Sequence, residues 1–417
     1  MLMASPDGDV RPTALAPLGR SGRDIVDVGR WIPLPPGSQL LTMPDCSPIG
    51  QKRGQAVHAS GLPVAAALPH GYTRTLLPAY EKQEGAEPLP LFAYTAVAEA
   101  GGRFYAAAMK TDDAPEWDPA HFHTPDLAGR ITALQREFPA NGLIAQLGRC
   151  AGEYGCYTAQ NTFYGRWEAA LPTSNACNAL CIGCISEQEP DGPPTPQERI
   201  RAMARQRDVV EVAVRHLERA EPAMVSYGQG CEGEPLLNWR LLVASTQAIR
   251  RRTSRGWINV NTNGSIPHGM AALIAAGLDA CRVSVFSARQ PVFAAYYRPR
   301  NYCFADVERS LTLASEAGLF TSINLLLFPG VTDQELEIEA LIGMLRRTGT
   351  RMVQLRNLTI DPEQLLDALP PPDRPALGVA TLVNRLRTDV PGLVIGNASR
   401  LPGQILKPTG LAHSVGS

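Results

Sequence analysis

The chain contains few lysines, which occur only at Lys52, Lys82, Lys110 and Lys407, whereas arginine is abundant. The central part of the chain therefore offers no lysine amine at all. An enzyme that forms a Schiff base with a carbonyl substrate or with pyridoxal phosphate needs such an amine. We accordingly do not expect Schiff-base chemistry in this region.

The chain also lacks an apolar run of the roughly 18 residues that a membrane-spanning helix needs. Its first residues contain neither the basic segment nor the apolar segment of a secretion signal. The net charge is −1 and the sequence pI is about 6.7, so no overall basic field favours nucleic acid or an anionic membrane surface. We expect a cytoplasmic protein with neither a membrane partner nor a nucleic-acid partner.

Nine cysteines, an odd number at irregular spacing without a secretion signal, argue against a disulfide framework and for reduced thiols. Three of them, Cys177, Cys181 and Cys184, follow one another at C-x3-C-x2-C spacing. Soft thiolates favour zinc or an iron-sulfur cluster, and either normally takes four protein ligands, so a group of three leaves one position open. The sequence leaves undecided whether a second cluster binds to any of the others, Cys46, Cys150, Cys156, Cys231, Cys281 and Cys303.

The pattern of apolar runs divides the chain into four parts. Short runs broken by proline and glycine predict a β-rich accessory domain over residues 1–123, and residues 124–167 read as a helical bridge. Six strands that alternate with helices over residues 168–360 predict a parallel α/β core, whose ligands gather at the carboxyl ends of the strands. Residues 361–417 are expected to pack on that core.

One helix of the core has a strong local start signal. Thr195 suits the N-cap, Pro196 the first helical position and Glu198 the third residue of a capping box. We therefore predict a long helix from Thr195 to about Ala220.

Two further segments follow predicted strands. Cys231-Glu232-Gly233-Glu234-Pro235, preceded by Gly230, comes after the second strand, and Asn261-Thr262-Asn263-Gly264 ends the third. Together with the cysteine spacing, and in this order, they resemble the motifs of the radical S-adenosylmethionine (radical SAM) enzymes over residues 168–360. The order of several motifs is more specific than any one of them.

The resemblance implies a partial (β/α)6 TIM-like barrel in which the three cysteines hold a [4Fe-4S] cluster and S-adenosylmethionine (SAM) chelates the fourth iron. It also implies reductive cleavage of SAM to a 5′-deoxyadenosyl radical, which removes a hydrogen atom from a substrate, with flavodoxin or ferredoxin as the electron donor. The residues that match SAM-binding positions of the family are Gly233, Glu234, Pro235, Asn263, Ser284 and Asn324.

The sequence departs from the family at Gly183, because an aromatic residue usually precedes the third cysteine and helps to position the adenine of SAM. Cys231 is a candidate catalytic thiol, although a buried structural thiol explains it as well. Two groups of residues suit either a pocket for an anionic or planar substrate or a packed loop: Tyr296, Tyr297, Arg298 and Arg300, and the pair Arg356-Asn357. The substrate, a small molecule or a peptide, is not identified. The alternative is a non-catalytic protein with an iron-sulfur cluster for electron transfer or zinc that stabilises an interaction domain.

Overall fold

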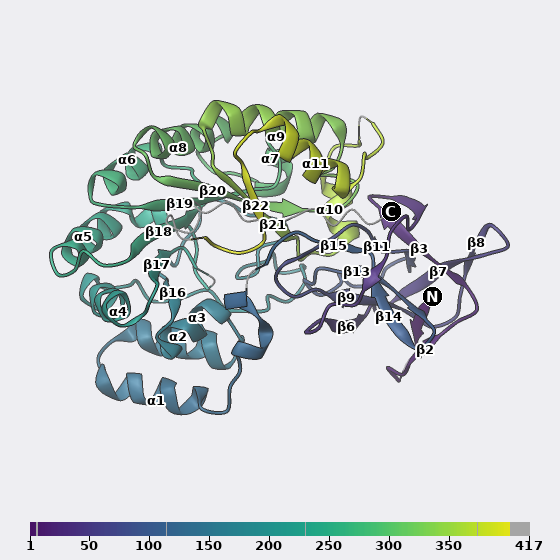
Figure 1. Ribbon diagram of the computed structural model, residues 1–417, viewed down its shortest axis with the longest axis horizontal. Helices are drawn as coiled ribbons and strands as arrows, with labels where there is room; N and C mark the ends of the chain where they lie inside the picture. Colours follow the sequence, from purple (N-terminus) through teal and green to yellow (C-terminus); the bar gives the residue numbers. More distant parts are fainter. Residues whose placement is uncertain (6, 114, 230, 373, 401–417) are drawn as a thin grey trace.

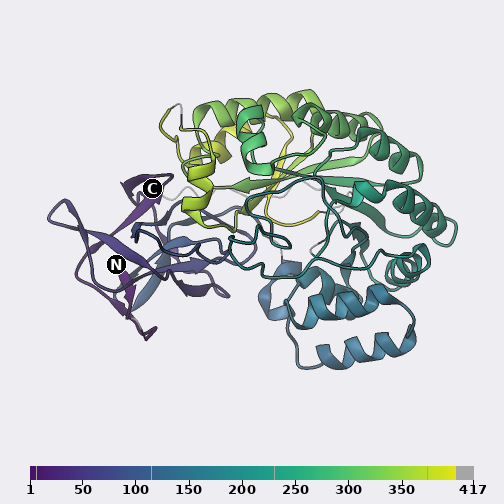
Figure 2. The same cartoon turned by 180° about the vertical axis from the view of Figure 1, so that it is seen from behind.

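A computed structural model describes residues 1–400 except residues 6, 114, 230 and 373. The N-terminal strands lie at one end of the molecule, and a parallel sheet with its helices forms the other (Figures 1 and 2). Of the three helices between these parts, α3 (Tyr157–Tyr164) lies beside the first strand of that sheet, β16 (Trp167–Leu171), and α1 (Leu127–Glu137) and α2 (Gly142–Gly152) pack on α3.

The first part of the chain is built of short antiparallel strands, as its proline- and glycine-broken pattern predicts. One sheet has the order β2-β1-β9-β13-β14-β5 with β6 beside β9, and another has the order β11-β3-β7-β12 with β4 and β8 at its sides. The strands are β1 Leu2–Ala4, β2 Val10–Pro12, β3 Ala16–Ser21, β4 Asp24–Asp27, β5 Ile32–Pro33, β6 Gln39–Thr42, β7 Cys46–Lys52, β8 Gln55–His58, β9 Leu62–Ala67, β10 Tyr72–Arg74, β11 Leu77–Pro78, β12 Tyr80–Lys82, β13 Thr95–Ala100, β14 Arg103–Ala106 and β15 Ala108–Lys110.

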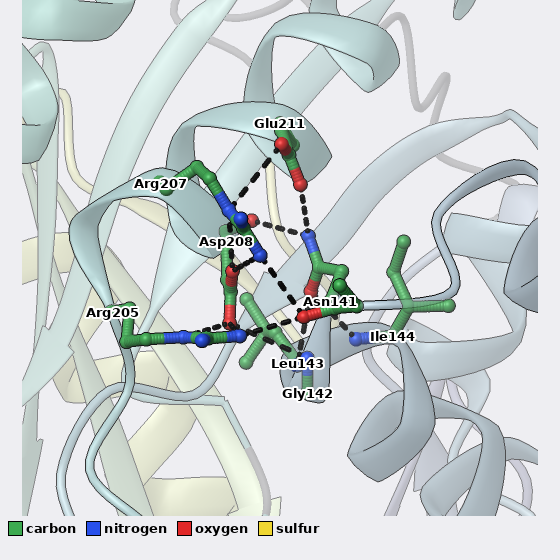
Figure 3. A network of polar contacts seen from close by, with 9 residues as sticks. Asn141, Gly142, Leu143, Ile144, Arg205, Arg207, Asp208 and Glu211 are labelled. Carbon is green, nitrogen blue, oxygen red and sulfur yellow. Dashed lines mark hydrogen bonds and ion pairs between the residues drawn. The ribbon is translucent and has the colours of Figure 1, made fainter.

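A helical segment connects these strands to the parallel sheet: η1 Pro115–Trp117, η2 Pro119–His121, α1 Leu127–Glu137, α2 Gly142–Gly152 and α3 Tyr157–Tyr164. Asn141 fastens this segment to the core (Figure 3). Its carboxamide oxygen caps α2 by accepting hydrogen bonds from two backbone N–H groups, and its amide nitrogen donates to the carbonyl oxygen of Asp208 (3.0 Å) on α4 and to Glu211 (2.9 Å).

The core is a parallel sheet in the order β16 to β22, with β16 and β22 at its edges. Its strands are β16 Trp167–Leu171, β17 Ala223–Tyr227, β18 Trp257–Thr262, β19 Ala280–Val285, β20 Phe320–Leu327, β21 Met352–Asn357 and β22 Val394–Gly396. Its helices are α4 Gln206–Arg219, η3 Pro235–Asn238, α5 Trp239–Arg250, α6 Pro267–Ala275, α7 Gln290–Tyr297, α8 Phe304–Glu316, α9 Glu335–Thr348, α10 Pro362–Ala368 and α11 Val379–Asp389. The parallel α/β prediction is confirmed, and β22 adds a seventh strand to the six expected.

The two faces of this sheet differ in polarity because successive side chains of a strand alternate between them. Val260, Val283 and Ile323 are fully buried in the apolar core of the molecule. The alternate positions carry polar groups instead, including Arg282 and Asn324. A polar face of this kind offers hydrogen-bonding groups to a ligand.

The predicted start of the long helix is wrong: α4 begins at Gln206, and residues 195–205 are not helical. Tertiary contacts hold this segment outside a helix. The Ile200 N–H donates to the carbonyl oxygen of Cys231 (2.7 Å), and Gln197 accepts a hydrogen bond from the Cys231 thiol (2.8 Å). Such contacts outweigh a local capping signal, which stabilises a helix by only about 1 kcal/mol.

The N-terminal strands contact the core at the carboxyl end of β21. Asn357 accepts a hydrogen bond from the Arg74 N–H (2.9 Å) and donates to the carbonyl oxygen of Tyr72 (3.0 Å). The buried Arg74 guanidinium also donates to the carbonyl oxygen of Leu358 (2.8 Å). The strands β10 and β15 therefore lie beside the carboxyl ends of the parallel strands, where parallel α/β proteins bind their ligands.

Candidate cluster and cofactor site

The three cysteines lie on a loop, called here the cysteine loop (residues 172–186), that leaves the carboxyl end of β16. On one side this loop contacts the end of α7. The Leu180 N–H donates to the carbonyl oxygen of Tyr297 (3.0 Å), and the Ile182 N–H donates to that of Tyr296 (3.1 Å). These two bonds fix the backbone between the first and third cysteines.

On its other side the cysteine loop pairs with the segment that follows β17. The Gly233 N–H donates to the carbonyl oxygen of Ser174, and the Glu234 N–H donates to that of Ala176, both at 2.8 Å. A Cβ atom on Gly233 would lie 2.0 Å from the Ala176 oxygen, so only glycine permits this approach. Glycine is thus required at position 233 because the backbone there lies directly against the cysteine loop.

Glu232, to which the sequence assigned no role, anchors the start of the cysteine loop. One carboxylate oxygen accepts hydrogen bonds from the Thr173 and Ser174 N–H groups (2.8 Å each) and from the Thr173 hydroxyl (3.2 Å). The other accepts from the Gly228 N–H (2.7 Å). Burial raises the pKa of Glu232 to about 8, although these hydrogen bonds act in the opposite direction. The sequence signal was a glutamate where the family usually has glycine.

Glu234 joins the same segment to the end of β18. Its carboxylate accepts hydrogen bonds from the Asn263 N–H (2.7 Å), the Thr262 hydroxyl (2.5 Å) and the Leu236 N–H (2.9 Å). Burial raises the pKa of Glu234 to about 7. Pro235 begins the helix η3, for which Glu234 is the cap. The carboxylate retains room for a further donor, because its two oxygens can accept about four hydrogen bonds.

The remaining predicted SAM contacts fall into two groups. The Asn263 side chain donates to Asn178 of the cysteine loop (2.9 Å), so the structure brings it to the cysteines. Ser284 and Asn324 are paired in register on β19 and β20, on the polar face of the sheet. Asn324 is in turn paired in register with Gln354 of β21, so the three side chains follow one another across the sheet.

The electrostatic surroundings of the thiols are mixed. Burial raises the pKa of Cys177 to about 11 and raises that of Cys181 as well, which favours the protonated thiols in the absence of metal. The Arg199 guanidinium opposes this, because it lies near both groups and donates a hydrogen bond to the Cys184 sulfur (3.7 Å). Arg199 stands in the segment expected to be helical, and no local signal indicated that it reaches the cysteine loop.

Three thiols on one loop with a neighbouring guanidinium suit a thiolate-ligated cluster that keeps one iron open. A metal ion would displace the thiol protons, because only the thiolate is a ligand. Over the described residues, no three Cys, His, Asp or Glu side chains are gathered as ligands of a single metal ion.

Cys231, the candidate catalytic thiol, is 1% exposed. It belongs to the same apolar cluster as Cys150, and a hydrogen bond to that cysteine, followed by burial, raises the pKa of Cys231. Its thiol also donates a hydrogen bond to Gln197 (2.8 Å), and the neighbouring Glu232 bonds to the cysteine loop.

An aromatic ring lies beside Gly183, although the sequence has none at that position. A Cβ atom on Gly183 would lie 3.0 Å from the Tyr296 hydroxyl oxygen and 3.3 Å from the carbonyl oxygen of Thr359. Tyr296 comes from α7, is buried, and stacks on Phe286 with ring centroids 4.4 Å apart. The small residue before the third cysteine thus makes room for a ring from another element.

We expect Gly183→Phe to reduce the iron retained after anaerobic reconstitution severalfold, because the new ring and Tyr296 need the same space. The double variant Gly183→Phe/Tyr296→Ala should regain much of the loss. The wild type, Gly183→Phe, Tyr296→Ala and the double variant form a double-mutant cycle. Iron per chain and melting temperature, measured for all four proteins, give the coupling between the two positions. Equal losses with and without Tyr296 would contradict the steric explanation.

Comparison with known proteins agrees with the cysteine motif. Residues 171–342 match the profile of the Radical SAM superfamily. No curated protein sequence matches the chain. The described part of the chain contains no helix with the length and apolar character to cross a membrane.

Similar solved structures are distant. The methyltransferase TsrM from Kitasatospora setae, solved with tryptophan substrate and a SAM analogue, is 19% identical over 46% of this chain and 36% of its own, with a TM-score of 0.36. A radical SAM methyltransferase from Sphaerobacter thermophilus is 14% identical over 55% and 64%, with a TM-score of 0.38. The hydrogenase maturase HydG from Carboxydothermus hydrogenoformans is 14% identical over 67% and 73%, with a TM-score of 0.39. This chain thus spans about a third of the length of TsrM.

The profile match and the cysteine loop coincide in the chain. Residues 171–342, which include that loop, are similar to the Radical SAM superfamily.

Proposed function

We propose that Cys177, Cys181 and Cys184 hold the [4Fe-4S] cluster and that the chain cleaves SAM reductively to remove a hydrogen atom from a substrate. When bound and reduced, the cluster supplies one electron to the sulfonium of SAM, which breaks the C5′–S bond and yields a 5′-deoxyadenosyl radical. The observation that carries the proposal is the fixed position of the cysteine loop, which Gly233 and Glu234 hold on one side and α7 on the other.

The residues around the loop have distinct proposed roles. Glu234 and the backbone at Gly233 and Pro235 are acceptors suited to the ammonium of SAM, and Asn263 lies beside them. Ser284 and Asn324 present hydroxyl and amide groups along the polar face of the sheet, toward which the rest of SAM would extend. These roles follow the family pattern residue by residue, and the hydrogen bonds above support them.

We further propose that the parallel sheet is the partial (β/α)6 barrel of such enzymes, within the four-part division of residues 1–123, 124–167, 168–360 and 361–417. Residues 401–417 of the last part lie outside the described residues. A flavodoxin or ferredoxin is the proposed electron donor. A catalytic role for Cys231 stays a prediction, since its thiol is buried beside Cys150.

Titration of the reconstituted chain with SAM separates the enzyme from an iron-sulfur electron carrier, which needs no SAM site. We expect Glu234→Gln to weaken SAM binding at least tenfold, because the amide replaces an anionic acceptor of the SAM ammonium with a partly donating group. Calorimetry measures the affinity, and the melting temperature shows whether the variant still folds.

Iron analysis of the same samples gives the number of clusters. About four irons per chain is expected for one cluster, and about eight would indicate a second cluster at other cysteines. Folded protein that binds iron but not SAM would contradict the enzymatic proposal and favour the electron carrier.

A further inference from the structure

A cavity of about 340 Å³ lies between the N-terminal strands and the carboxyl end of β21. It is bounded on the N-terminal side by His70 and Tyr72, on the helical side by Tyr157, and on the core side by Arg356 and Thr359. Thr359 also places its carbonyl oxygen next to Gly183 of the cysteine loop. The cavity therefore adjoins the proposed cofactor site at the edge of the sheet where ligands of α/β proteins bind.

Arg356 brings a positive charge to this cavity without a carboxylate partner. Its guanidinium donates to the side chains of Gln354 (3.3 Å), His70 (3.4 Å) and Asn324 (3.5 Å), which are neutral groups at long distances. No ion pair of Arg356 occurs within the described residues. Burial, followed by the charge of Arg282, lowers the pKa of Arg356 to about 10, so the group is still a cation at neutral pH.

Glu168 and Asp112, whose charges act on Arg356, bond directly to other groups. Glu168 pairs with Arg282 (3.4 Å) and accepts hydrogen bonds from Ser226 and Gln229 (2.7 Å each). Asp112 forms an ion pair with Arg400 and accepts from the Asn397 N–H (2.8 Å). Both carboxylates act on the charge of Arg356 and raise its pKa, but neither bonds to its guanidinium, so an anionic ligand would supply the direct partner that this half-buried cation lacks among the described residues.

His70 reinforces this preference. Because a guanidinium can only donate, the His70 Nδ1 that lies 3.4 Å from Arg356 accepts, and the ring proton is on Nε2. Burial and the charge of Arg356 lower the pKa of His70 to about 3, so the ring is neutral at physiological pH. The imidazole thus supplies an N–H donor and no second charge.

Tyr157 lines the cavity on the helical side, and further aromatic rings pack behind it and behind His70. The His70 ring lies 5.4 Å from Trp117 and 6.3 Å from Tyr157, measured between centroids. Tyr157 in turn stacks on Phe122 with centroids 3.7 Å apart. A wall of this kind favours a planar or apolar molecular body over a strongly hydrated one.

We propose that this cavity is the substrate site and that it takes a small organic carboxylate, with the carboxylate paired to Arg356 and a planar or apolar body against Tyr157. The inference rests on the proposed function, because it identifies the cavity's ligand as the substrate of the radical reaction. The volume lies at the small end of the range for ligand pockets, which favours a small molecule over a folded protein partner. Arginine suits this role because its planar fork matches a carboxylate in two parallel hydrogen bonds.

Calorimetric titration of the reconstituted, SAM-bound protein with benzoate, phenylpyruvate and phenylalanine tests the proposal, with benzamide and phenyl phosphate as comparison ligands. We expect at least one carboxylate to bind, benzamide to bind at least tenfold more weakly than benzoate, and Arg356→Gln to weaken carboxylate binding at least tenfold. Arg356→Lys should retain part of the affinity. The control is Arg351→Gln, an exposed arginine just before the same strand, which should leave binding unchanged.

Three results would overturn the proposal: no carboxylate binds, benzoate and benzamide bind alike, or phenyl phosphate binds more tightly than every carboxylate. Formation of 5′-deoxyadenosine without substrate, measured on the same samples, separates this test from the proposed function. The control variant Arg351→Gln should retain that activity. Carboxylate binding that depends on Arg356 in a protein that never cleaves SAM would leave the site in place and reject the radical reaction.

Discussion

Gly233→Ala is expected to lose nearly all of its iron after anaerobic reconstitution. The new methyl carbon would have to lie 2.0 Å from the carbonyl oxygen of Ala176, so the segment after β17 must move away from the cysteine loop. That movement breaks the two 2.8 Å hydrogen bonds that join the segments, and each buried donor left unpaired costs about 1–3 kcal/mol. The cysteines would then lose their fixed positions.

The matched control for this change is Gly129→Ala. Gly129 lies within α1, and a Cβ atom there has no heavy atom within 4 Å. Alanine is the better helix former by about 1 kcal/mol, so this variant should keep its iron and its melting temperature. A Gly233→Ala protein with as much iron per chain as the control would contradict the role assigned to the glycine.

Much of the core was predictable because its signals are local. Runs such as residues 257–261 and 282–286 lie between turn signals, and the structure places β18 at Trp257–Thr262 and β19 at Ala280–Val285. The cysteine spacing is also readable without a structure. Both kinds of signal depend on neighbours in the sequence, so they survive without knowledge of the packing.

The prediction failed where distant segments meet. The capping signal at Thr195 was a valid local pattern, but residues 197–200 contact Cys231 instead of forming a helix. The ring beside the third cysteine comes from Tyr296, more than a hundred positions further along the chain. Spacing cannot indicate such a replacement, because its cause is the position of α7 against the loop.

In the candidate site, too, local sequence signals indicated some residues, and contacts between distant segments were needed to find the others. The order of the motifs indicated Glu234 and Asn263, and the structure brings both to the cysteine loop. The sequence did not assign roles to Glu232 and Arg199, whose functions are apparent only from the groups that they contact. Arg356 was open to two interpretations, and the cavity beside it favours a binding role.

The second large effect concerns the cluster itself. Cys181 is the central member of the three cysteines. Burial, followed by the charges of Cys184 and Cys177, raises the pKa of its thiol well above the ordinary value. Cys181→Ala removes one of the three proposed iron ligands, and the cysteine loop has no cysteine besides Cys177 and Cys184 to replace it. We expect 5′-deoxyadenosine formation to fall to background, a loss of at least a hundredfold, while Cys303→Ala, at an exposed cysteine, should retain full activity.

The central claim, that this chain cleaves SAM at the cysteine loop, is tested most directly by measuring 5′-deoxyadenosine after reconstitution with iron and sulfide and reduction with dithionite in the presence of SAM. The account predicts product from the wild-type and Cys303→Ala proteins and none above background from Cys181→Ala. Equal product from the wild-type and Cys181→Ala proteins, or none from a wild-type protein that has bound its cluster, SAM and a carboxylate ligand, would contradict it.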